Sequence, residues 1–390
     1  MKSTLRRTWA EIDLDALENN YCQLKKRIGN TKFLGVVKAD AYGHGAIQVS
    51  QKLAKLGADY LAVSSIDEAM ELRENDIDMP ILILGHTPKE QVDNLIQYNL
   101  TQTITCKAKA IEYEDVLLNT HKKLKVHIKV DTGMSRLGYL CDDEGFDTGV
   151  EGIYEVCCYD NLDVEGIFTH FAMSDDDSDK AKAYTKHQFD LFQRVCHEVE
   201  IKWGQSFKIK HCANTGAVAN YPETYLDMVR PGLLLYGYGE YAKDLGLLPV
   251  MSLKTAISTI KIYPKGTSIS YGGTYVTDKK TRVGVMPIGY ADGFQRILSN
   301  KCSLMTKNGP TRQIGRICMD MSMIDLTDCP DVDINSEIEI FGKHNSIDEL
   351  AKIAQTIPYE LTCSVSKRVP RKYIENNQII DEELLLRFPR

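Results

Sequence analysis

The chain has 390 residues, which is more than one hydrophobic core usually organises, so its length predicts about two domains. Hydrophobic residues make up 43% and charged residues 26% of the chain, which excludes a disordered protein or a coiled coil. The net charge of -7, without a concentrated basic face, argues against a nucleic-acid partner.

No segment has the roughly 18 consecutive apolar residues of a membrane helix, and no apolar segment follows the two arginines near the start. The 11 cysteines include no CxxC pair, so we interpret them as reduced thiols and expect neither disulfides nor zinc. The sequence therefore predicts a soluble, cytoplasmic protein without a metal site.

The first 230 residues alternate between short apolar runs and stretches with helical spacing. Leu14, Leu17, Tyr21 and Leu24 share one helical face, for example, and predict a helix. This alternation is typical of parallel strands joined by crossover helices, and its length fits a (β/α)8 barrel. A doubly wound sheet is the alternative, but no GxGxxG follows a strand. The predicted strands are 33–38, 60–64, 81–84, 101–104, 124–130, 164–169, 208–211 and 227–230.

After residue 250, short alternating runs of β-branched and aromatic residues replace the helical pattern and predict a second, mostly β domain. We place the barrel at residues 1–250, with the first residues packing with the β domain, and the β domain at 251–390. One helix, 347–355, interrupts the strands, and Pro370 is expected at a turn or edge. The expected strands lie in SLKTAISTIKIY, SISYGGTYVT, TRVGVMPIGYA, TRQIGRICMDMSMIDL, SEIEIFG and SVSKRVPRKYI.

The segment VVKADAYGHGA, residues 36–46, places Lys38 at the end of an apolar run. The carboxyl ends of the strands form the ligand-binding face of a barrel. A desolvated lysine has a lowered pKa and can form a Schiff base with an aldehyde cofactor. From this segment alone, an exposed lysine after a strand is the simpler interpretation.

Other polar residues also follow predicted barrel strands, where an active site would be assembled. Each one alone is better explained by packing or an ion pair, but together they indicate a site. A phosphate could be held by Thr215, by backbone N–H groups at the start of the helix in HCANTGAV, by the turn at Gly232 and by the hydroxyl of Tyr42. The strand-end residues are Lys38, Lys129, Asp131, Arg136, His170, His211, Asn214, Thr215 and Arg230.

Ten motifs are spread along nearly the whole chain: RTWAEIDLDAL, VVKADAYGHGA, HIKVDTGMSRLG, FTHFA, HCANTGA, VRPGLLLYG, SISYGGTY, MPIGYADG, GRICMDMSMIDL and SKRVPR. In this order they resemble the alanine racemase family of fold-type III pyridoxal-phosphate enzymes. The resemblance implies a (β/α)8 barrel with a C-terminal β domain, pyridoxal 5'-phosphate as cofactor, a small amino-acid substrate and D-alanine supply for peptidoglycan. It also implies a head-to-tail homodimer, in which each active site combines one subunit's barrel with its partner's β domain.

The resemblance makes Lys38 the Schiff-base lysine and one of two catalytic acid–base groups, the other being Tyr271. Racemisation removes the α-proton from one face of the substrate and returns one to the other face, so two groups on opposite faces suit it. Lys38 would serve the D-face and Tyr271 the L-face, with His170 in the network that stabilises the phenolate. Arg230 matches the residue on the cofactor's pyridine nitrogen, which a guanidinium leaves unprotonated. Without the resemblance, Tyr271 is an aromatic strand residue beside a turn.

The remaining matches concern the substrate and the cofactor phosphate. Arg136 matches a residue near the substrate carboxylate, and Lys129 a lysine that is carbamylated in many members, with an ordinary salt bridge as the alternative. Met319 and Asp320 fall in the loop that donates a backbone N–H to the carboxylate, and Tyr290 lines the access corridor. A purely hydrophobic role is the alternative for Met319 and Tyr290. The implied cofactor-binding residues are Lys38, Tyr42, His170, Asn214, Thr215, Arg230, Gly232 and Lys367.

Lys367 departs from the family's pattern. In SVSKRVPR it occupies the position where alanine racemases usually carry a tyrosine that reaches the cofactor phosphate and narrows the pocket. Serine racemases of the vancomycin-resistance type carry a small polar residue there. A lysine either places an ammonium on the phosphate or leaves a wider, more polar site, so serine or another small amino acid is an alternative substrate.

Three functions outside racemisation are the alternatives. Related barrels act as pyridoxal-phosphate amino-acid decarboxylases, and a small single-domain relative binds the cofactor without known turnover. The decarboxylases usually depend on a later cysteine motif that this sequence lacks, and the binding proteins lack a β domain with the Tyr271 segment. A noncatalytic carbohydrate- or peptide-binding module on a barrel is the third.

Overall fold

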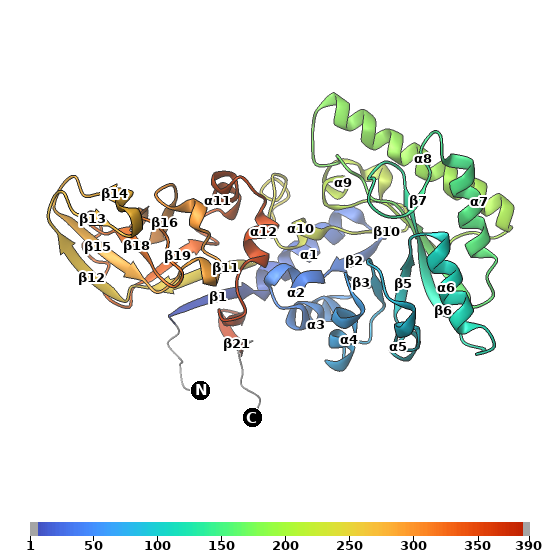
Figure 1. Ribbon diagram of the computed structural model, residues 1–390, viewed down its shortest axis with the longest axis horizontal. Coiled ribbons are helices and arrows are strands. Elements are labelled where there is room, and N and C mark those ends of the chain that lie inside the picture. The colour runs from blue at the N-terminus through green and yellow to red at the C-terminus, as the bar shows by residue number, and fades with distance from the viewer. Residues whose placement is uncertain (1–6, 385–390) are drawn as a thin grey trace. The chain divides into compact units, whose positions relative to one another are not determined.

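The computed structural model describes residues 7–384, and the chain divides into two units (Figure 1). The barrel unit comprises Tyr21–Ala41 and Ala46–Leu235. The β unit comprises the described residues of Met1–Asn20, together with Tyr42–Gly45 and Tyr236–Arg390. The domain boundary placed after residue 250 stays a prediction.

Eight parallel strands of the described barrel unit form one sheet, in the order β10-β2-β3-β4-β5-β6-β8-β9, with the short β7 beside β6. Each predicted strand segment overlaps one of them, which confirms the predicted barrel. The N–H of Asp227 donates to the carbonyl of Lys210 at 3.1 Å, so the first and last strands also connect. The strands are β2 (Lys32–Val36), β3 (Tyr60–Val63), β4 (Ile81–Ile83), β5 (Thr101–Ile104), β6 (Leu124–Asp131), β7 (Tyr139–Leu140), β8 (Leu162–Phe168), β9 (Ile209–His211) and β10 (Met228–Val229).

Burial on both faces explains why the barrel strands are continuous apolar runs, such as the fully buried YLAV of β3. Helices flank these strands in Figure 1, and two of them, α4 and α8, begin after a capping serine. Ser65 and Glu68 form a capping box at α4, and Ser178 accepts a backbone N–H at the start of α8. The helices are α1 (Leu14–Ile28), α2 (Lys38–Gly43), α3 (Ala46–Leu56), α4 (Ile66–Glu74), α5 (Val92–Gln97), α6 (Lys107–Leu117), α7 (Phe146–Cys157), α8 (Asp179–Trp203), α9 (Thr215–Asn220) and α10 (Gly232–Leu235).

Ten strands of the described β unit form a second sheet, in the order β12-β15-β18-β17-β16-β19-β11-β1-β20-β21. β1 (Thr8–Asp13), near the start of the chain, pairs antiparallel with β11 and parallel with β20. This sheet confirms the predicted mostly β second domain. Its other strands, and the separate pair β13–β14, are β11 (Met251–Ala256), β12 (Thr259–Tyr263), β13 (Ser268–Ile269), β14 (Tyr275–Val276), β15 (Thr281–Met286), β16 (Ser303–Thr306), β17 (Gly309–Ile314), β18 (Ser322–Asp325), β19 (Glu337–Phe341), β20 (Arg371–Glu375) and β21 (Gln378–Glu383).

The last part of the β unit contains α11 (Ile347–Ala354), in the predicted helix 347–355, and α12 (Pro358–Cys363), which was not predicted from the sequence. The segment SVSKRVPRKYI was predicted as a strand, which is wrong for the part before Arg371. Arg371 is 2% exposed and donates to the carbonyls of Val365, Ser366 and Val369. The loop therefore folds around a buried guanidinium instead of extending.

Within residues 7–384, no helix combines the length and the apolar character needed to cross a membrane. All the cysteines are free thiols, seven of them buried or partly buried and therefore used mainly as small core residues.

Candidate active site

Lys38 lies at the carboxyl end of β2, followed by a turn with an unusual backbone. The φ angles of Ala39, Asp40, Ala41 and Tyr42 are 52°, 54°, 51° and 54°, so α2 is a left-handed turn. For L-residues this conformation costs roughly 1–2 kcal/mol per residue. Strained backbone of this kind concentrates at functional sites, which makes the Lys38 turn the first candidate.

Two carboxylates hold the left-handed turn in place. Glu68 accepts the N–H of Ala39 at 2.7 Å with one oxygen and the N–H of Ser64 at 2.6 Å with the other. Asp40 accepts the N–H of Ala46 at 2.8 Å. These hydrogen bonds fix the backbone on both sides of the turn, so they also fix the position from which the Lys38 side chain starts.

The barrel unit brings five predicted site residues together at the strand ends. The pKa of His170 lies well below its ordinary value because the ring is buried and because Arg230, Lys129, Arg136 and Lys38 act on it. A guanidinium N–H of Arg230 also donates to Nδ1 of His170 at 3.3 Å, which places these two side chains in contact. We call these five residues the strand-end cluster.

Arg230 is the buried centre of the strand-end cluster, with 5% of its surface exposed. Its guanidinium donates to Nδ1 of His211 at 2.8 Å and to the carbonyls of Thr169 and Cys212 at 2.8 and 3.2 Å. Burial lowers the pKa of Arg230 to about 10, which leaves the group protonated at neutral pH. Arg230 is thus a rigid cation that can donate but cannot accept a hydrogen bond.

Lys129 is a buried amine at the end of β6. Its Nζ donates to the carbonyl of Val130 at 3.2 Å and lies 5.0 Å from the centroid of the Phe168 ring. Burial, followed by the charge of Arg230, holds the pKa of Lys129 well below its usual value. A lowered pKa favours the neutral, nucleophilic form of the amine, which makes this lysine more open to covalent modification.

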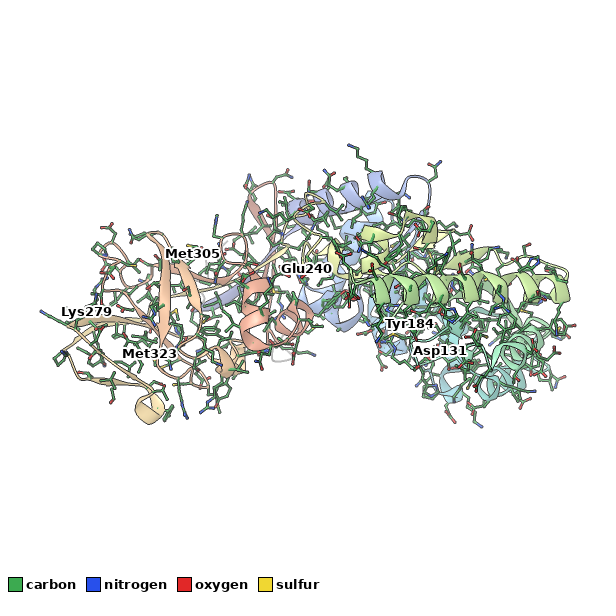
Figure 2. The ribbon with its side chains drawn as sticks, turned by 90° about the horizontal axis from the view of Figure 1, so that it is seen from above. Asp131, Tyr184, Glu240, Lys279, Met305 and Met323 are labelled. Carbon is green, nitrogen blue, oxygen red and sulfur yellow. The ribbon has the colours of Figure 1, made fainter. Side chains whose placement is uncertain are left out.

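Asp131, beside Lys129 on β6, organises the loop that carries Arg136. Its carboxylate accepts the N–H groups of Gly133, Ser135 and Arg136, each at 3.0 Å. Tyr184, labelled on α8 in Figure 2, donates its hydroxyl to the carbonyl of Gly133 at 2.7 Å. The carboxylate of Asp131 is therefore engaged by the loop, where it fixes the backbone of Arg136.

Three of the predicted cofactor-binding residues lie close together in the barrel unit. Asn214 caps α9, accepting the N–H of Ala217 at 3.3 Å, and Thr215 accepts the N–H of Leu233 at 3.0 Å, next to Gly232. The starts of α9 and α10 therefore lie together.

Two further predicted cofactor-binding residues, Tyr42 and Lys367, belong to the β unit. Tyr42 is buried against the rings of Tyr236 and Tyr359, and this burial raises its pKa well above the ordinary value. Lys367 is exposed, in the loop around Arg371.

The β unit brings the loops of Tyr271, Tyr290 and Met319 together. The hydroxyl of Ser270, before Tyr271, donates to the carbonyl of Arg316 at 2.7 Å. The N–H of Tyr290 donates to the carbonyl of Cys318 at 3.0 Å. At Gly289 a Cβ atom would lie 2.2 Å from that same carbonyl oxygen, so only glycine permits this approach.

A buried polar chain extends from Arg230, and its members beyond His211 were not predicted from the sequence. Because Arg230 donates to Nδ1 of His211, the other nitrogen of His211 donates to Nδ1 of His127, at 2.9 Å. Nε2 of His127 then faces Glu165 at 3.5 Å, and the hydroxyl of Tyr60 donates to Glu165 at 2.5 Å. The sequence signal that could have predicted this polar chain is the polar residue at every second position of the apolar strand LKVHIKV, which places these side chains on one face of the strand.

Glu165 makes the stability of the fold depend on pH. His127, which has the larger effect, and Tyr60 lower the pKa of Glu165 to about 2, although partial burial acts in the opposite direction. The unfolded chain has a glutamate pKa of about 4.3, so this stabilisation is complete above that pH and is lost as the pH falls toward 2. We expect Glu165→Gln to destabilise the protein at pH 7 and to flatten the loss of stability below about pH 4.5. Urea unfolding between pH 2 and 7 measures this, with the exposed Glu223→Gln as control. Parallel pH profiles for the two variants would contradict the assignment.

A parallel barrel that gathers a lysine and a buried arginine at its strand ends, followed by a separate β sheet, defines a two-domain barrel enzyme. Residues 12–240 match the family model described as alanine racemase, N-terminal domain, and residues 250–373 match that of the C-terminal domain. The chain belongs to the alanine racemase family, as its ten motifs predicted.

Similar proteins cover the whole chain. Alanine racemase 2 of Caldanaerobacter subterraneus is 40% identical over 100% of both chains, and the alanine racemase of Clostridium tetani is 43% identical over 96% of this chain and 97% of its own. The solved alanine racemase of Clostridium difficile superposes with a TM-score of 0.92 at 38% identity, covering 98% of this chain and 100% of that one. The Bacillus anthracis enzyme, solved with bound L-Ala-P, has a TM-score of 0.86 at 31% identity over 98% of each chain.

Proposed function

We propose that this chain is an alanine racemase, an isomerase that interconverts L- and D-alanine with pyridoxal 5'-phosphate as cofactor. The strand-end cluster carries the proposal. Its two guanidinium groups, on Arg136 and Arg230, favour an anionic ligand, and the phosphate and the carboxylate of a cofactor–substrate pair supply the matching charge.

The residues of the barrel unit fit this cofactor. Backbone N–H groups at the start of α9, with Thr215 and Gly232, suit a phosphate. Arg230, which can only donate, suits the pyridine nitrogen, and Lys38 suits the aldehyde carbon. When bound, the cofactor supplies an electron sink for the charge left by the departing α-proton.

The proton transfers belong to the protein's own groups. Nζ of Lys38 exchanges a proton with Cα on the D-face, and the hydroxyl of the partner subunit's Tyr271 does so on the L-face. Tyr271, Met319 and Tyr290 are 72%, 54% and 43% exposed in the chain, and exposed apolar groups around one set of loops are typical of a surface that a second copy covers. A homodimer with shared active sites follows from this assignment.

The substrate carboxylate is assigned to Arg136 and to the backbone N–H of the partner subunit's Met319. The lowered pKa of Lys129 supports its carbamylation, because a neutral amine adds to carbon dioxide, and the resulting anion would orient Arg136. We assign the enzyme to the cytoplasm, where it supplies D-alanine for peptidoglycan.

The proposal is tested with the purified chain, pyridoxal 5'-phosphate and either alanine enantiomer. We expect both reactions to approach equal amounts of L- and D-alanine, measured by chiral chromatography. A cofactor-saturated protein that forms no D-alanine from L-alanine would refute the assignment.

Lys367 is expected to admit serine as a second substrate. A lysine in place of the family's tyrosine leaves a more polar pocket, and one such contact usually changes discrimination by roughly 10- to 100-fold. We expect measurable racemisation of L-serine, and we expect Lys367→Tyr to lower kcat/KM for serine relative to alanine by about tenfold.

The exposed Lys343→Tyr is the control for Lys367→Tyr, because it adds the same ring to another loop of the β unit. Serine turnover at background in the unmodified enzyme, with normal alanine turnover, would show that Lys367 does not widen specificity.

A further inference from the structure

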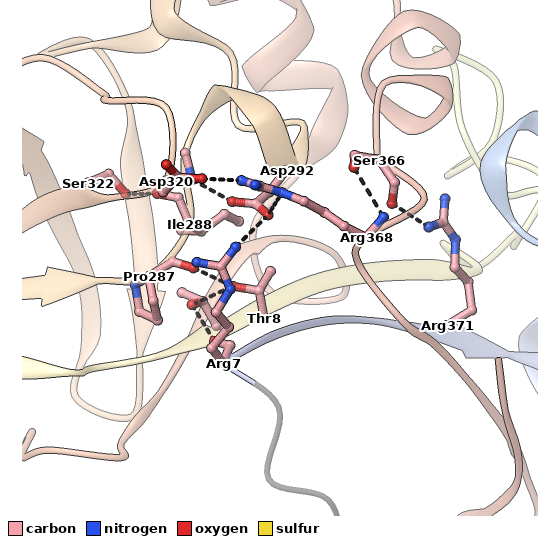
Figure 3. A network of polar contacts seen from close by, with 12 residues as sticks. Arg7, Thr8, Pro287, Ile288, Asp292, Asp320, Ser322, Ser366, Arg368 and Arg371 are labelled. Atoms are coloured by element: carbon pink, nitrogen blue, oxygen red, sulfur yellow. Dashed lines mark hydrogen bonds and ion pairs between the residues drawn. The ribbon is translucent and has the colours of Figure 1, made fainter. Parts of the chain in front are cut away.

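A buried carboxylate, Asp292, joins loops of the β unit that carry predicted site residues (Figure 3). Its side chain is 1% exposed. One oxygen accepts the N–H of Gly289 at 2.9 Å and so closes the turn of Tyr290. The other accepts Nε of Arg368 at 2.8 Å and a guanidinium N–H of Arg7 at 3.2 Å. These partners compensate the desolvation of the carboxylate.

Arg368 makes a second ion pair, with a different loop. Its terminal nitrogen donates to Asp320 at 2.7 Å, so one guanidinium bridges two carboxylates (Figure 3). The planar fork of arginine suits this bridge, whereas the ammonium of a lysine is a point charge without that geometry. Arg368 therefore couples the turn of Met319 and Asp320 to the buried Asp292.

The Met319 turn is held from both sides. On one side, the carbonyl of Met319 accepts the N–H of Ala291 at 3.1 Å. On the other side, Asp320 is held by Arg368. The N–H assigned to the substrate carboxylate belongs to the preceding peptide, Cys318–Met319, whose carbonyl accepts the N–H of Tyr290 at 3.0 Å. This donor therefore lies in a turn whose hydrogen bonds leave it little freedom.

The loop that carries Arg368 is itself fixed. The backbone N–H of Arg368 donates to the hydroxyl of Ser366 at 3.2 Å. The carbonyl of Ser366 accepts a hydrogen bond from the guanidinium of the buried Arg371 at 2.7 Å. The N–H of Ser366 also donates to the carbonyl of Asp292 at 3.3 Å. The Arg368 guanidinium is therefore presented from a rigid loop.

We infer that Arg368 is a positioning residue for substrate binding, which acts by holding the Met319 turn in the conformation that meets the carboxylate. This inference rests on the proposed function for its effect on alanine, but the geometry of the turn can be measured without it. Arg368 itself is not assigned a contact with substrate or cofactor.

Arg368→Gln, Arg368→Lys and Asp320→Asn test the inference, with Arg282→Gln as the matched control. Arg282 is similarly shielded, at 21% exposed against 28% for Arg368, and it also pairs with an aspartate, Asp333. It holds the carbonyls of Cys329 and Val332 rather than the Met319 turn.

We expect Arg368→Gln to raise KM for alanine about tenfold, as for the loss of a charge-assisted hydrogen bond, with a smaller change in kcat. Arg368→Lys should recover part of this loss. Asp320→Asn should raise KM without lowering Tm, because Arg368 keeps its ion pair with the buried Asp292. Amide hydrogen exchange of residues 315–321 in the cofactor-free chain should be faster in Arg368→Gln and Asp320→Asn, and unchanged in Arg282→Gln.

Equal KM values in Arg368→Gln and Arg282→Gln would overturn the positioning role. So would unchanged exchange of residues 315–321 in Arg368→Gln, whatever its Tm. Failure of the proposed function is distinguishable, because it would appear as an unmodified enzyme that does not racemise alanine, while the exchange experiment would still report on the turn.

Discussion

Replacing Lys38 by alanine is expected to abolish racemisation in both directions, by at least about 1,000-fold in kcat. The amine is assigned two roles, as the covalent partner of the cofactor and as the acid–base group on the D-face, and alanine provides neither. The loss should be accompanied by loss of the visible absorbance band of the bound cofactor. Steady-state kinetics with each enantiomer and an absorbance spectrum of the cofactor-treated protein measure both effects.

Lys38→Arg should be nearly as inactive, because a guanidinium keeps its proton and is no nucleophile at neutral pH. The matched control is Lys32→Ala, an exposed lysine at the opposite end of the same strand, β2. It should leave the rate and the spectrum unchanged. A Lys38→Ala enzyme that keeps more than about a tenth of the rate would contradict the assignment.

The position of Lys38 was predictable, but the turn after it was not. The apolar run of β2 continues through Val37 to the lysine, and such runs are visible in sequence because barrel strands are buried on both faces. The left-handed turn from Ala39 to Tyr42 contains no glycine that would announce it. Its conformation depends on Asp40 and on Glu68 from α4, and the contact with α4 exists only once the chain has folded.

In the rest of the site, too, positions that follow a local sequence pattern were predictable, and contacts between distant segments were not. Arg230 and His170 could be predicted because they directly follow strands, and strand ends share one face of a barrel. The pairing of Arg368 with Asp292 spans 76 positions and leaves no local pattern. The loop around Arg371 was mistaken for a strand because β propensity describes single residues in extended backbone. It contains no information about a buried guanidinium that binds several carbonyls of the loop.

Replacing Tyr271 by phenylalanine is expected to lower kcat in both directions by at least about 1,000-fold, because the L-face proton can then be neither removed nor delivered. Lys38 should still exchange the α-proton of D-alanine with deuterated solvent. The variant should thus label D-alanine but not L-alanine, which proton NMR measures. Tyr271 is 72% exposed, so its hydroxyl contributes little to folding and Tm should not change.

Tyr275→Phe, in the strand after the same turn, is the control and should racemise normally. Equal loss of labelling from both enantiomers in Tyr271→Phe would contradict a base for each face.

Mixing the Lys38→Ala and Tyr271→Phe chains decides whether Tyr271 acts across subunits. Each chain alone has no complete site. If sites are shared, a mixed dimer contains one site with both changes and one with neither, so random reassociation should restore about a quarter of the normal activity. If each chain builds its own site, every site in the mixture lacks one of the two groups, and no activity should return. The recovered rate therefore reports which subunit supplies the L-face proton, independently of how far either substitution slows the reaction.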